Sequence, residues 1–327
     1  MKTLMIDSLV GNEYAACLCQ GLHDAGVDVE LIATEDREIA DHYTFTVSKI
    51  APSKEEDKNK AFKLIKYFQY LILIVWLAKR KRANAVHFQF FRRERMESLL
   101  FPIMRLLGIY LVHTAHNVLP HEHSRIDYYF KYLVYRSSNA IIVHSQYIKD
   151  KLLRMFKVDP DKIAVIPHGN FDVYLPKEKI TQVEAREKLS LDQATPILLF
   201  FGYIREYKGV GHLLETFDQA ADEVPDVKLI VAGNPHTEEL GERYQKQIEG
   251  MRHKDRVIYV PMFIPTEDVA LYFSAADAVT LPYKHIDHSG IVHMAYSFGK
   301  PVIALVKWII AHPAATLIHQ DSLKIIS

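Results

Sequence analysis

The stretch FFGYIREYKGVG, residues 200–211, places two cationic side chains directly after an apolar run. Gly202 and Gly209 permit backbone conformations that other residues avoid, and the side chains of Arg205 and Lys208 offer donors for the oxygen atoms of a phosphate or diphosphate. The same residues also fit a solvated turn between a strand and a helix that binds nothing. This stretch alone leaves both interpretations open.

A helix start within LPYKHIDHSGIVHMAYSFGKPVIA, residues 281–304, is a second feature that suits an anion. Ser289 is the expected N-cap, and Gly290 lets a ligand approach the first free N–H groups of the helix. An ordinary capped helix is the alternative. Because two such features occur in one half of the chain, we favour a phosphate-binding function for that half.

Histidines gather in VHTAHNVLPHEHS, residues 112–124. We expect His116 and Asn117, just past a predicted strand, to point into a cleft as sugar hydrogen-bonding groups, with His116 also able to act as a polarising imidazole. A structural role for His116 is the alternative. A zinc site needs ligands that converge, which a strand-to-loop segment does not ensure, so we expect no metal. The other metal-capable side chains here are His113, His121, Glu122 and His123.

Composition excludes several classes of function. Lys+Arg and Asp+Glu are equal at 40 each, so no global field attracts nucleic acid. The two cysteines, Cys17 and Cys19, are too close on a predicted helix for an unstrained disulfide, and we expect a reduced, cytoplasmic compartment. The first strand runs into IDSLVGNEYAA, which lacks the G-x-G-x-x-G of dinucleotide-binding proteins. P-loop and nucleophile-elbow motifs are also absent from the sequence.

Short apolar strands alternate with helical segments along the chain, the pattern of parallel sheets covered on both faces. The pattern predicts an α/β domain over residues 1–172, a polar linker region over 173–195 and a second α/β domain over 196–327. The candidate residues follow predicted strands, where ligands bind in open α/β sheets. The predicted strands are TLMID, VDVELIA, NAVHFQ, IYLVHTA, NAIIVHS, KIAVIPHG, ILLFFG, VKLIVAG, VIYVP, AVTLPY and PVIAL.

One predicted helix is unusually apolar. The run YFQYLILIVWLA, residues 67–78, lies between Lys63 and Lys66 on one side and KRKR on the other. It is too short to span a bilayer, which needs about 20 residues. Two interpretations remain: a buried helix with a basic end, or a helix from Phe62 to Arg82 that lies among anionic lipid headgroups as a peripheral membrane contact.

The chain resembles the GT-B glycosyltransferases of family 4, and within them a bacterial subgroup with a series of ordered motifs. These read here TAHNVLPHE, VHS, VIPHGN, FFGYIREYKG and LPYKHIDHSGIVHMAYSFGKPVIA, in the subgroup's order over about residues 110–304. The resemblance implies two Rossmann-like domains that face a cleft. It also implies retaining, metal-independent hexosyl transfer from a nucleoside-diphosphate sugar to a glycan or lipid-linked acceptor, in polysaccharide or glycoconjugate synthesis. The donor is then a substrate, and no cofactor is expected.

The resemblance also implies roles for individual residues. Arg205 and Lys208 would bind the donor diphosphate beside Gly202, helped by the backbone N–H groups of Ser289 and Gly290. His116 would meet the donor sugar near the reacting carbon. The remaining donor-side positions that the family pattern suggests are the loop from Gly11 to Glu13, Asn117, and Phe263 with Ile264 at the nucleobase.

The chain departs from the wider family in places. Many members have an arginine at the position of Tyr203 and glutamates at the positions of Ile286 and Met294. After PVIA the family's glycine-rich loop is not recognisable in LVKWIIAHPAATLIHQDSLKIIS, so we expect a second domain that is truncated or altered at its C-terminus. A non-catalytic nucleotide-sugar-binding remnant is therefore the alternative function, and a sugar-nucleotide epimerase of the same architecture is a further one.

Overall fold

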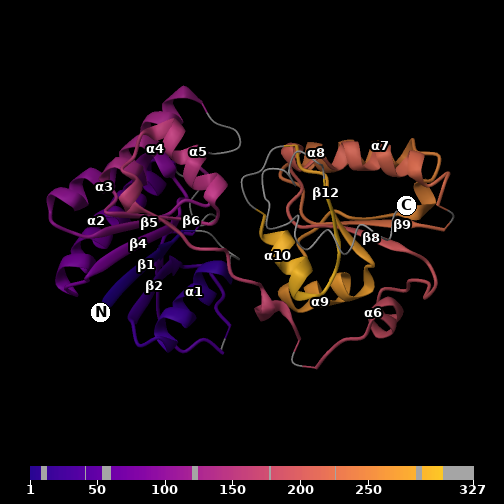
Figure 1. The fold of residues 1–327 in the computed structure, drawn as a ribbon, viewed down its shortest axis with the longest axis horizontal. Coiled ribbons are helices and arrows are strands. Elements are labelled where there is room, and N and C mark those ends of the chain that lie inside the picture. The colour runs from indigo at the N-terminus through magenta and orange to yellow at the C-terminus, as the bar shows by residue number, and fades with distance from the viewer. Residues whose placement is uncertain are drawn as a thin grey trace. The chain divides into compact units, whose positions relative to one another are not determined.

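A computed structural model describes residues 1–8, 13–40, 42–53, 60–119, 124–176, 178–224, 226–284 and 289–304. The chain divides into two compact units, the first being Met1–His168 and the second beginning at Gly169. Each unit contains one parallel β-sheet with helices on both faces (Figure 1). The predicted class, α/β with two Rossmann-like domains, is confirmed.

The first unit is built on a seven-stranded parallel sheet of order β3-β2-β1-β4-β5-β6-β7. The chain reverses its direction of winding at β1, and ligands of open α/β sheets bind near such points, beyond the carboxyl ends of the strands. The strands are β1 (Lys2–Asp7), β2 (Asp28–Thr34), β3 (Thr46–Ala51), β4 (Ala85–Phe90), β5 (Leu111–Thr114), β6 (Ala140–Val143) and β7 (Ile163–Val165).

Two hydrophobic cores cover the two faces of this sheet. The smaller core joins α1 to β1 and β2 through residues such as Met5, Ala16 and Leu31. The larger core joins the other helices to the opposite face through residues such as Tyr70 and Phe101, which are at most 2% exposed. The helices are α1 (Glu13–Asp24), α2 (Lys60–Arg80), α3 (Glu94–Leu106), α4 (Arg125–Ser137) and α5 (Gln146–Phe156).

The second unit has a five-stranded parallel sheet of order β10-β9-β8-β11-β12. Helices α7 and α8 lie on one face, while α9 and α10 lie on the other (Figure 1). Its strands are β8 (Ile197–Phe201), β9 (Lys228–Ala232), β10 (Val257–Val260), β11 (Ala278–Leu281) and β12 (Val302–Ala304). Its helices are α6 (Gln182–Lys188), α7 (Val210–Ala220), α8 (Glu238–Glu249), α9 (Thr266–Ala275) and α10 (Gly290–Ser297).

The segment between the two sheets is more ordered than a polar linker. A capping box between Thr181 and Glu184 starts α6, because each residue's side chain bonds the backbone of the other. Arg186 on α6 is 4% exposed and pairs with Asp277, just before β11, at 2.8 Å. Helix α6 therefore belongs to the second unit. The C-terminal residues 305–327, on which the predicted truncation rests, lie outside the described residues.

Strand β3 is an element that the sequence patterns did not predict. Its residues TVSKIA do not alternate regularly between polar and apolar side chains, and all but Ala51 are partly or fully exposed. Such weak patterning is typical of an edge strand, and among the described residues β3 pairs with β2 alone.

Candidate functional site

Lys208 is a buried cation without a counter-ion. Its side chain is 9% exposed, and it forms no hydrogen bond or ion pair with any residue that the structure describes. Burial, and secondly the nearby charge of Arg205, lowers the pKa of Lys208 to about 8. A desolvated cation is costly unless it is paired, so its surroundings favour the arrival of an anion.

Gly202 joins the two anion-binding features of the sequence. It follows β8 with a φ of +96°, a conformation that suits glycine. A Cβ atom on Gly202 would lie 3.6 Å from Lys208 Nζ and 3.3 Å from Ile291 Cδ1 in the first turn of α10. The bare backbone of Gly202 thus lies between the ammonium group and the helix start, as the predicted diphosphate site requires.

The turn that presents Lys208 is held by close backbone packing. Lys208 ends the short 3₁₀ helix η3 (Glu206–Lys208), and Gly209 follows it with a φ of +73°. A Cβ atom on Gly209 would lie 2.1 Å from the carbonyl oxygen of Pro282, after β11. The ring of the next residue, Tyr283, faces Lys208 with its centroid 5.6 Å from Nζ. Two neighbouring strands therefore fix the position of the ammonium group.

Helix α10 begins at Gly290, as predicted, with Ser289 as N-cap. Ser289 is 6% exposed, and its hydroxyl makes no capping hydrogen bond. The first N–H groups of a helix have no partner within it, and the helix dipole adds positive potential there. A Cβ atom on Gly290 would lie 3.0 Å from Phe171 Cε2, so the packing allows no larger residue without movement.

Arg205 lies half-buried beside Lys208 and has no ionic partner among the described residues. The acidic neighbour Glu206 pairs with Arg243 and not with Lys208 or Arg205. Tyr203, where the family resemblance predicts an arginine in many members, is 52% exposed. Arg205 therefore remains the residue that we predict to assist Lys208.

Other predicted donor-side residues are not joined to Lys208 by any interaction of the described residues. Phe263 follows the edge strand β10 and is 61% exposed, whereas the adjacent Ile264 is buried in the core. Met294, where the family resemblance predicts a glutamate, is buried on α10. Gly11 and Ile286 lie outside the described residues. The predicted nucleobase contacts thus stay predictions.

In the first unit, His116 lies at the carboxyl ends of the central strands. Its Nε2 is 3.0 Å from Gln89 Oε1 on β4, and its Nδ1 is 3.3 Å from Nε2 of His144, which follows β6. The Phe90 ring stacks on the imidazole with a centroid distance of 3.9 Å and an angle of 12°. Residues from three strand ends therefore fix one imidazole ring.

Aromatic rings close this group on its remaining side. The Tyr14 ring on α1 meets the edge of His116 at 4.9 Å and packs against His168 at 4.6 Å. Burial lowers the pKa of His144, partly offset by its contact with the Ile166 carbonyl, and burial raises the pKa of Tyr14 to about 12. Both side chains are therefore neutral near pH 7.

Asn117 has an unmet hydrogen-bonding need. The residue is half-buried, and its Oδ1 has no partner among the described residues. Since a buried amide oxygen normally has a donor, a ligand hydroxyl would suit it. His113, by contrast, is a core residue, 1% exposed and stacked near Phe91. His121 and its neighbours lie outside the described residues, which contain no group of three or more His, Cys, Asp or Glu able to hold a metal ion.

Sequence reasoning missed several members of these two groups. Gln89 carries a signal, because its polar side chain alternates with apolar ones in AVHFQF yet belongs to a central strand. Phe90, Tyr14 and Tyr283 carry none, since a sequence does not distinguish aromatic residues at a site from aromatic residues in a core.

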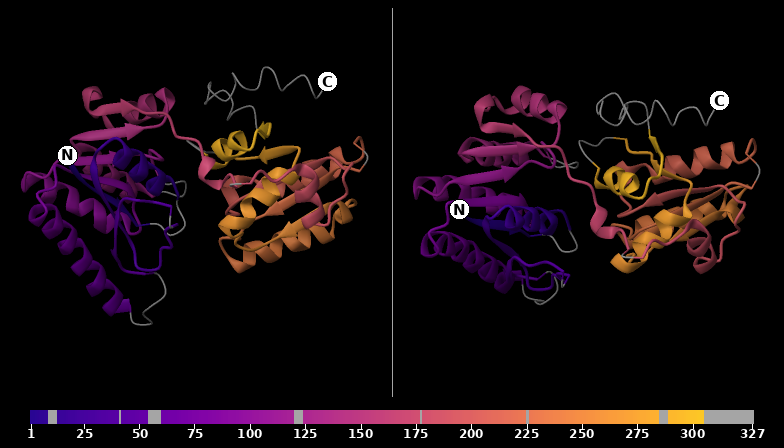
Figure 2. Two further views of the ribbon diagram at one scale, coloured as in Figure 1. Left: turned by 90° about the horizontal axis from the view of Figure 1, so that it is seen from below. Right: turned by 60° about the horizontal axis from the view of Figure 1, so that its bottom comes forward.

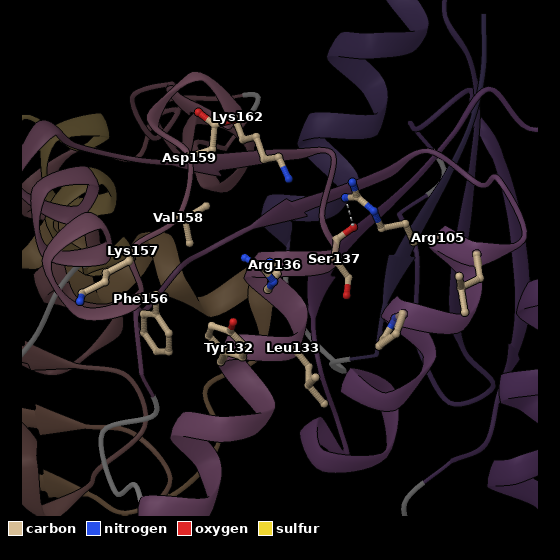
Figure 3. A pocket seen from close by; sticks show the side chains of 12 residues that line it. Arg105, Tyr132, Leu133, Arg136, Ser137, Phe156, Lys157, Val158, Asp159 and Lys162 are labelled. Carbon is tan, nitrogen blue, oxygen red and sulfur yellow. Dashed lines mark hydrogen bonds between the residues drawn. The ribbon is translucent and has the colours of Figure 1, made fainter.

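A cavity of about 760 Å³ in the first unit contains none of the predicted site residues (Figure 3). It lies where α3, α4 and α5 end, whereas the predicted site lies at the carboxyl ends of the strands. Two of its basic residues complement the negative end of α4, since Arg105 donates to Ser137 O at 3.1 Å and Lys162 to Ser138 O at 3.3 Å. We therefore assign these two cations a structural role.

Two family models match the chain. Residues 11–169 match the model described as Glycosyltransferase Family 4, and residues 181–308 match Glycosyl transferases group 1. The GDP-mannose:glycolipid 4-beta-D-mannosyltransferase of Xanthomonas campestris pv. campestris is 28% identical over 65% of this chain and 54% of that protein. The chain spans about half the length of the curated relatives it matches.

Solved structures resemble the whole described fold. Sucrose-phosphate synthase from Thermosynechococcus elongatus matches with a TM-score of 0.73 and 18% identity, over 93% of this chain and 80% of that one. HepE of Anabaena, solved in complex with UDP-glucose, matches with a TM-score of 0.71 and 16% identity over the same shares, 93% and 80%.

Proposed function

This chain belongs to the GT-B glycosyltransferases of the family 4 type, and we propose that it moves a hexose from a nucleoside-diphosphate sugar to an acceptor hydroxyl. The two family models cover parts of both units, and the two parallel sheets agree with the GT-B fold that the motifs predict. The unpaired, buried ammonium group of Lys208 is the observation that carries the proposal.

A diphosphate suits the surroundings of Lys208 better than a single carboxylate does. Two cations, Lys208 and Arg205, lie close enough for the charge of one to lower the pKa of the other. The first turn of α10 adds backbone N–H groups on the other side of Gly202. Donors on two sides of a bare glycine match a ligand with several phosphate oxygens, and they would stabilise the charge of a leaving diphosphate.

The class of donor follows from the same proposal. The related mannosyltransferase is named for GDP-mannose, and the Anabaena structure contains UDP-glucose. We propose a nucleoside-diphosphate hexose as the donor substrate, with a glycan or a lipid-linked sugar as the acceptor, in polysaccharide or glycoconjugate synthesis. No separate cofactor enters this scheme.

We further propose that transfer retains the anomeric configuration and needs no metal ion. The bond between the anomeric carbon and the diphosphate breaks while the acceptor oxygen bonds to that carbon, and the proton of the acceptor hydroxyl passes to an oxygen of the leaving diphosphate. Lys208, Arg205 and the start of α10 then take the role of neutralising the diphosphate. His116, whose ring nitrogens face Gln89 and His144, would meet the donor sugar near the reacting carbon, and the unpartnered amide oxygen of Asn117 would accept a hydrogen bond from a sugar hydroxyl. Nuclear magnetic resonance of the product's anomeric proton tests the stereochemistry.

A thermal-shift screen with UDP-, GDP- and ADP-hexoses, followed by transfer assays with the stabilising donor, tests the function. We expect one class of donor to raise the melting temperature and to be consumed with an acceptor. Lys208→Ala should abolish both effects, whereas Lys246→Ala, at an exposed position on α8, should change neither. Stabilisation without turnover would indicate a binding module instead, and conversion of the donor without an acceptor would indicate an epimerase.

A further inference from the structure

Helix α2 buries one face and exposes an apolar one. Tyr67, Tyr70 and Ile74 are at most 3% exposed in the larger core of the first unit. The sequence left a buried helix and a membrane-surface helix as alternatives, and each describes one face of α2. Six large apolar side chains on the outer face are 47% to 60% exposed: Phe62, Leu64, Ile65, Phe68, Ile72 and Trp76.

The apolar surface continues on α3, which packs beside α2. Leu99, Ile103 and Leu106 follow one another at spacings of four and three residues, so they share one face of α3. They are 52%, 50% and 88% exposed. Lys79 near the end of α2 donates to the carbonyl oxygen of Leu107, which fixes the two helix ends side by side. Helix α2 runs along the outside of the first unit in both views of Figure 2.

Charges around this surface are of one sign over a long stretch. The sequence has no acidic residue from Lys58 to Arg93. Cations flank the apolar side chains, with Lys66 over the Phe62 ring at 5.0 Å and Arg80 over the Trp76 ring at 4.6 Å. Apolar side chains bordered by lysine and arginine are the composition of helices that lie in a membrane interface.

We infer that the outer faces of α2 and α3 dock onto a lipid bilayer that carries anionic headgroups. The apolar side chains enter the boundary between headgroups and acyl chains, while the flanking cations contact lipid phosphates. Residues 61–80 are long and apolar enough to cross a membrane by length and composition. However, the inner face of α2 packs on the sheet of the first unit, so the folded helix lies along the bilayer.

A second copy of the chain is a poorer occupant of this surface. A two-fold dimer places the same patch on both sides of its interface. Two α2 helices that pair antiparallel would bring Lys63 and Lys66 of one copy near Lys79 and Arg80 of the other. Like charges across an interface are unfavourable. Anionic lipid supplies the opposite charge.

Co-sedimentation of the full chain with vesicles tests the inference. We expect binding to phosphatidylglycerol-containing vesicles, weak binding to pure phosphatidylcholine, and release by salt. Phe68→Ser with Ile72→Ser should weaken partitioning about tenfold or more, because about half of each side chain is exposed. Lys79→Gln with Arg80→Gln should weaken it about fivefold per charge. Val183→Ser, a matched control that is 54% exposed on α6, should change nothing.

A fluorescence measurement separates docking from general stickiness. Trp308→Phe leaves Trp76 as the one tryptophan, since the sequence has two. Its emission should shift to the blue with anionic vesicles and not with neutral ones. The inference would be overturned if the Phe68→Ser, Ile72→Ser protein bound vesicles as well as the parent chain does. It would also be overturned if the parent chain formed dimers in solution and the same two substitutions made them dissociate. These measurements need no donor sugar, so they stand apart from the proposed transfer activity.

Discussion

The ammonium group of Lys208 lies 5.6 Å from the centroid of the Tyr283 ring. Among the described residues no carboxylate pairs with Lys208, and the face of the Tyr283 ring contacts its ammonium group instead. A ring quadrupole attracts a cation, but more weakly than a carboxylate does at the same depth. The arrangement therefore keeps Lys208 available to an incoming anion, at a cost to the stability of the free protein.

That cost predicts that removing the charge stabilises the free protein. The pKa of Lys208 is about 8 in the folded state and 10.5 for an ordinary lysine. Below pH 8 the folded state therefore carries an unfavourable charge worth about 3 kcal/mol at most. Lys208→Met should raise the free energy of unfolding at pH 7 by up to this amount, measured by urea denaturation. Lys246→Met, at an exposed position, should stay within about 0.5 kcal/mol.

The same pKa sets the direction of the pH dependence. Between pH 8 and 10.5 the unfolded state holds the proton that the folded state has released, so the stability of the parent protein should rise with pH in that window. Lys208→Met should lack this rise and should also lose stabilisation by nucleoside-diphosphate sugars. A destabilised Lys208→Met protein would contradict the description of Lys208 as an unpaired buried cation.

Gly209 should tolerate no side chain. Both Gly209 and Gly299 have positive φ, +73° and +64°, so alanine at either position carries backbone strain of about 1 kcal/mol. A Cβ atom on Gly209 would also lie 2.1 Å from Pro282 O, whereas a Cβ atom on Gly299 would have no atom of the described residues within 4 Å. Chemical denaturation should therefore show that Gly209→Ala lowers the free energy of unfolding by about 3 kcal/mol or more, and Gly299→Ala by about 1 kcal/mol. Equal losses would disprove the close approach at Pro282.

Buried histidines should make the first unit sensitive to acid. Burial lowers the pKa of His87 to about 3 and that of His113 well below its usual value. Below about pH 6.5 the unfolded state takes up these protons and the folded state does not. The free energy of unfolding therefore decreases as the pH is lowered through this range. Glu97 opposes the trend, because burial raises its pKa to about 7 and the folded state gains a proton.

Replacing one buried histidine isolates its part of this trend. His87→Gln should flatten the fall of unfolding free energy by about 1.4 kcal/mol per pH unit between pH 6 and pH 4.5. His212→Gln, whose imidazole is 57% exposed on α7, is the matched substitution at an exposed histidine. The free energies come from urea denaturation at several pH values. If His87→Gln left the dependence of unfolding free energy on pH unaltered, His87 would be taking up its proton in the folded protein over the same pH range.

Local sequence patterns predict the α/β class. They also place a motif directly after each of β5, β8 and β11, because each motif follows an apolar run in the sequence. The packing between those motifs is not local. Gly202 was identified as a flexible turn residue, but its place between Lys208 and Ile291 depends on how β8 lies beside β11. Likewise the contact of His116 with His144 depends on the pairing of β5 with β6.

The outer face of α2 shows the same limit in another form. Its sequence is apolar all round the helix, which indicates burial as readily as membrane contact. Which residues face outward is decided by the sheet that α2 covers, as with Tyr70 at 2% and Phe68 at 60% exposure. The sequence therefore predicted the helix, and the fold shows which of its apolar residues are buried and which are exposed.

His144 should act on transfer through His116. Its Nδ1 lies 3.0 Å from the carbonyl oxygen of Ile166, which accepts only, so this nitrogen carries the proton of the neutral ring. Its Nε2 then faces His116 Nδ1 at 3.3 Å and holds that ring in place. An asparagine side chain can reproduce the first contact and a glutamine side chain the second.

Comparing these two substitutions tests that role. His144→Asn should lower the turnover number about 10- to 100-fold, because the His116 ring loses its partner, while His144→Gln should retain more activity. Neither should change the thermal shift produced by the bare nucleoside diphosphate, whose proposed partners Lys208 and Arg205 lie in the second unit. His113→Gln, at a buried histidine without contact to His116, controls for lost packing. Equal turnover of the Asn and Gln proteins would show that His144 only fills space.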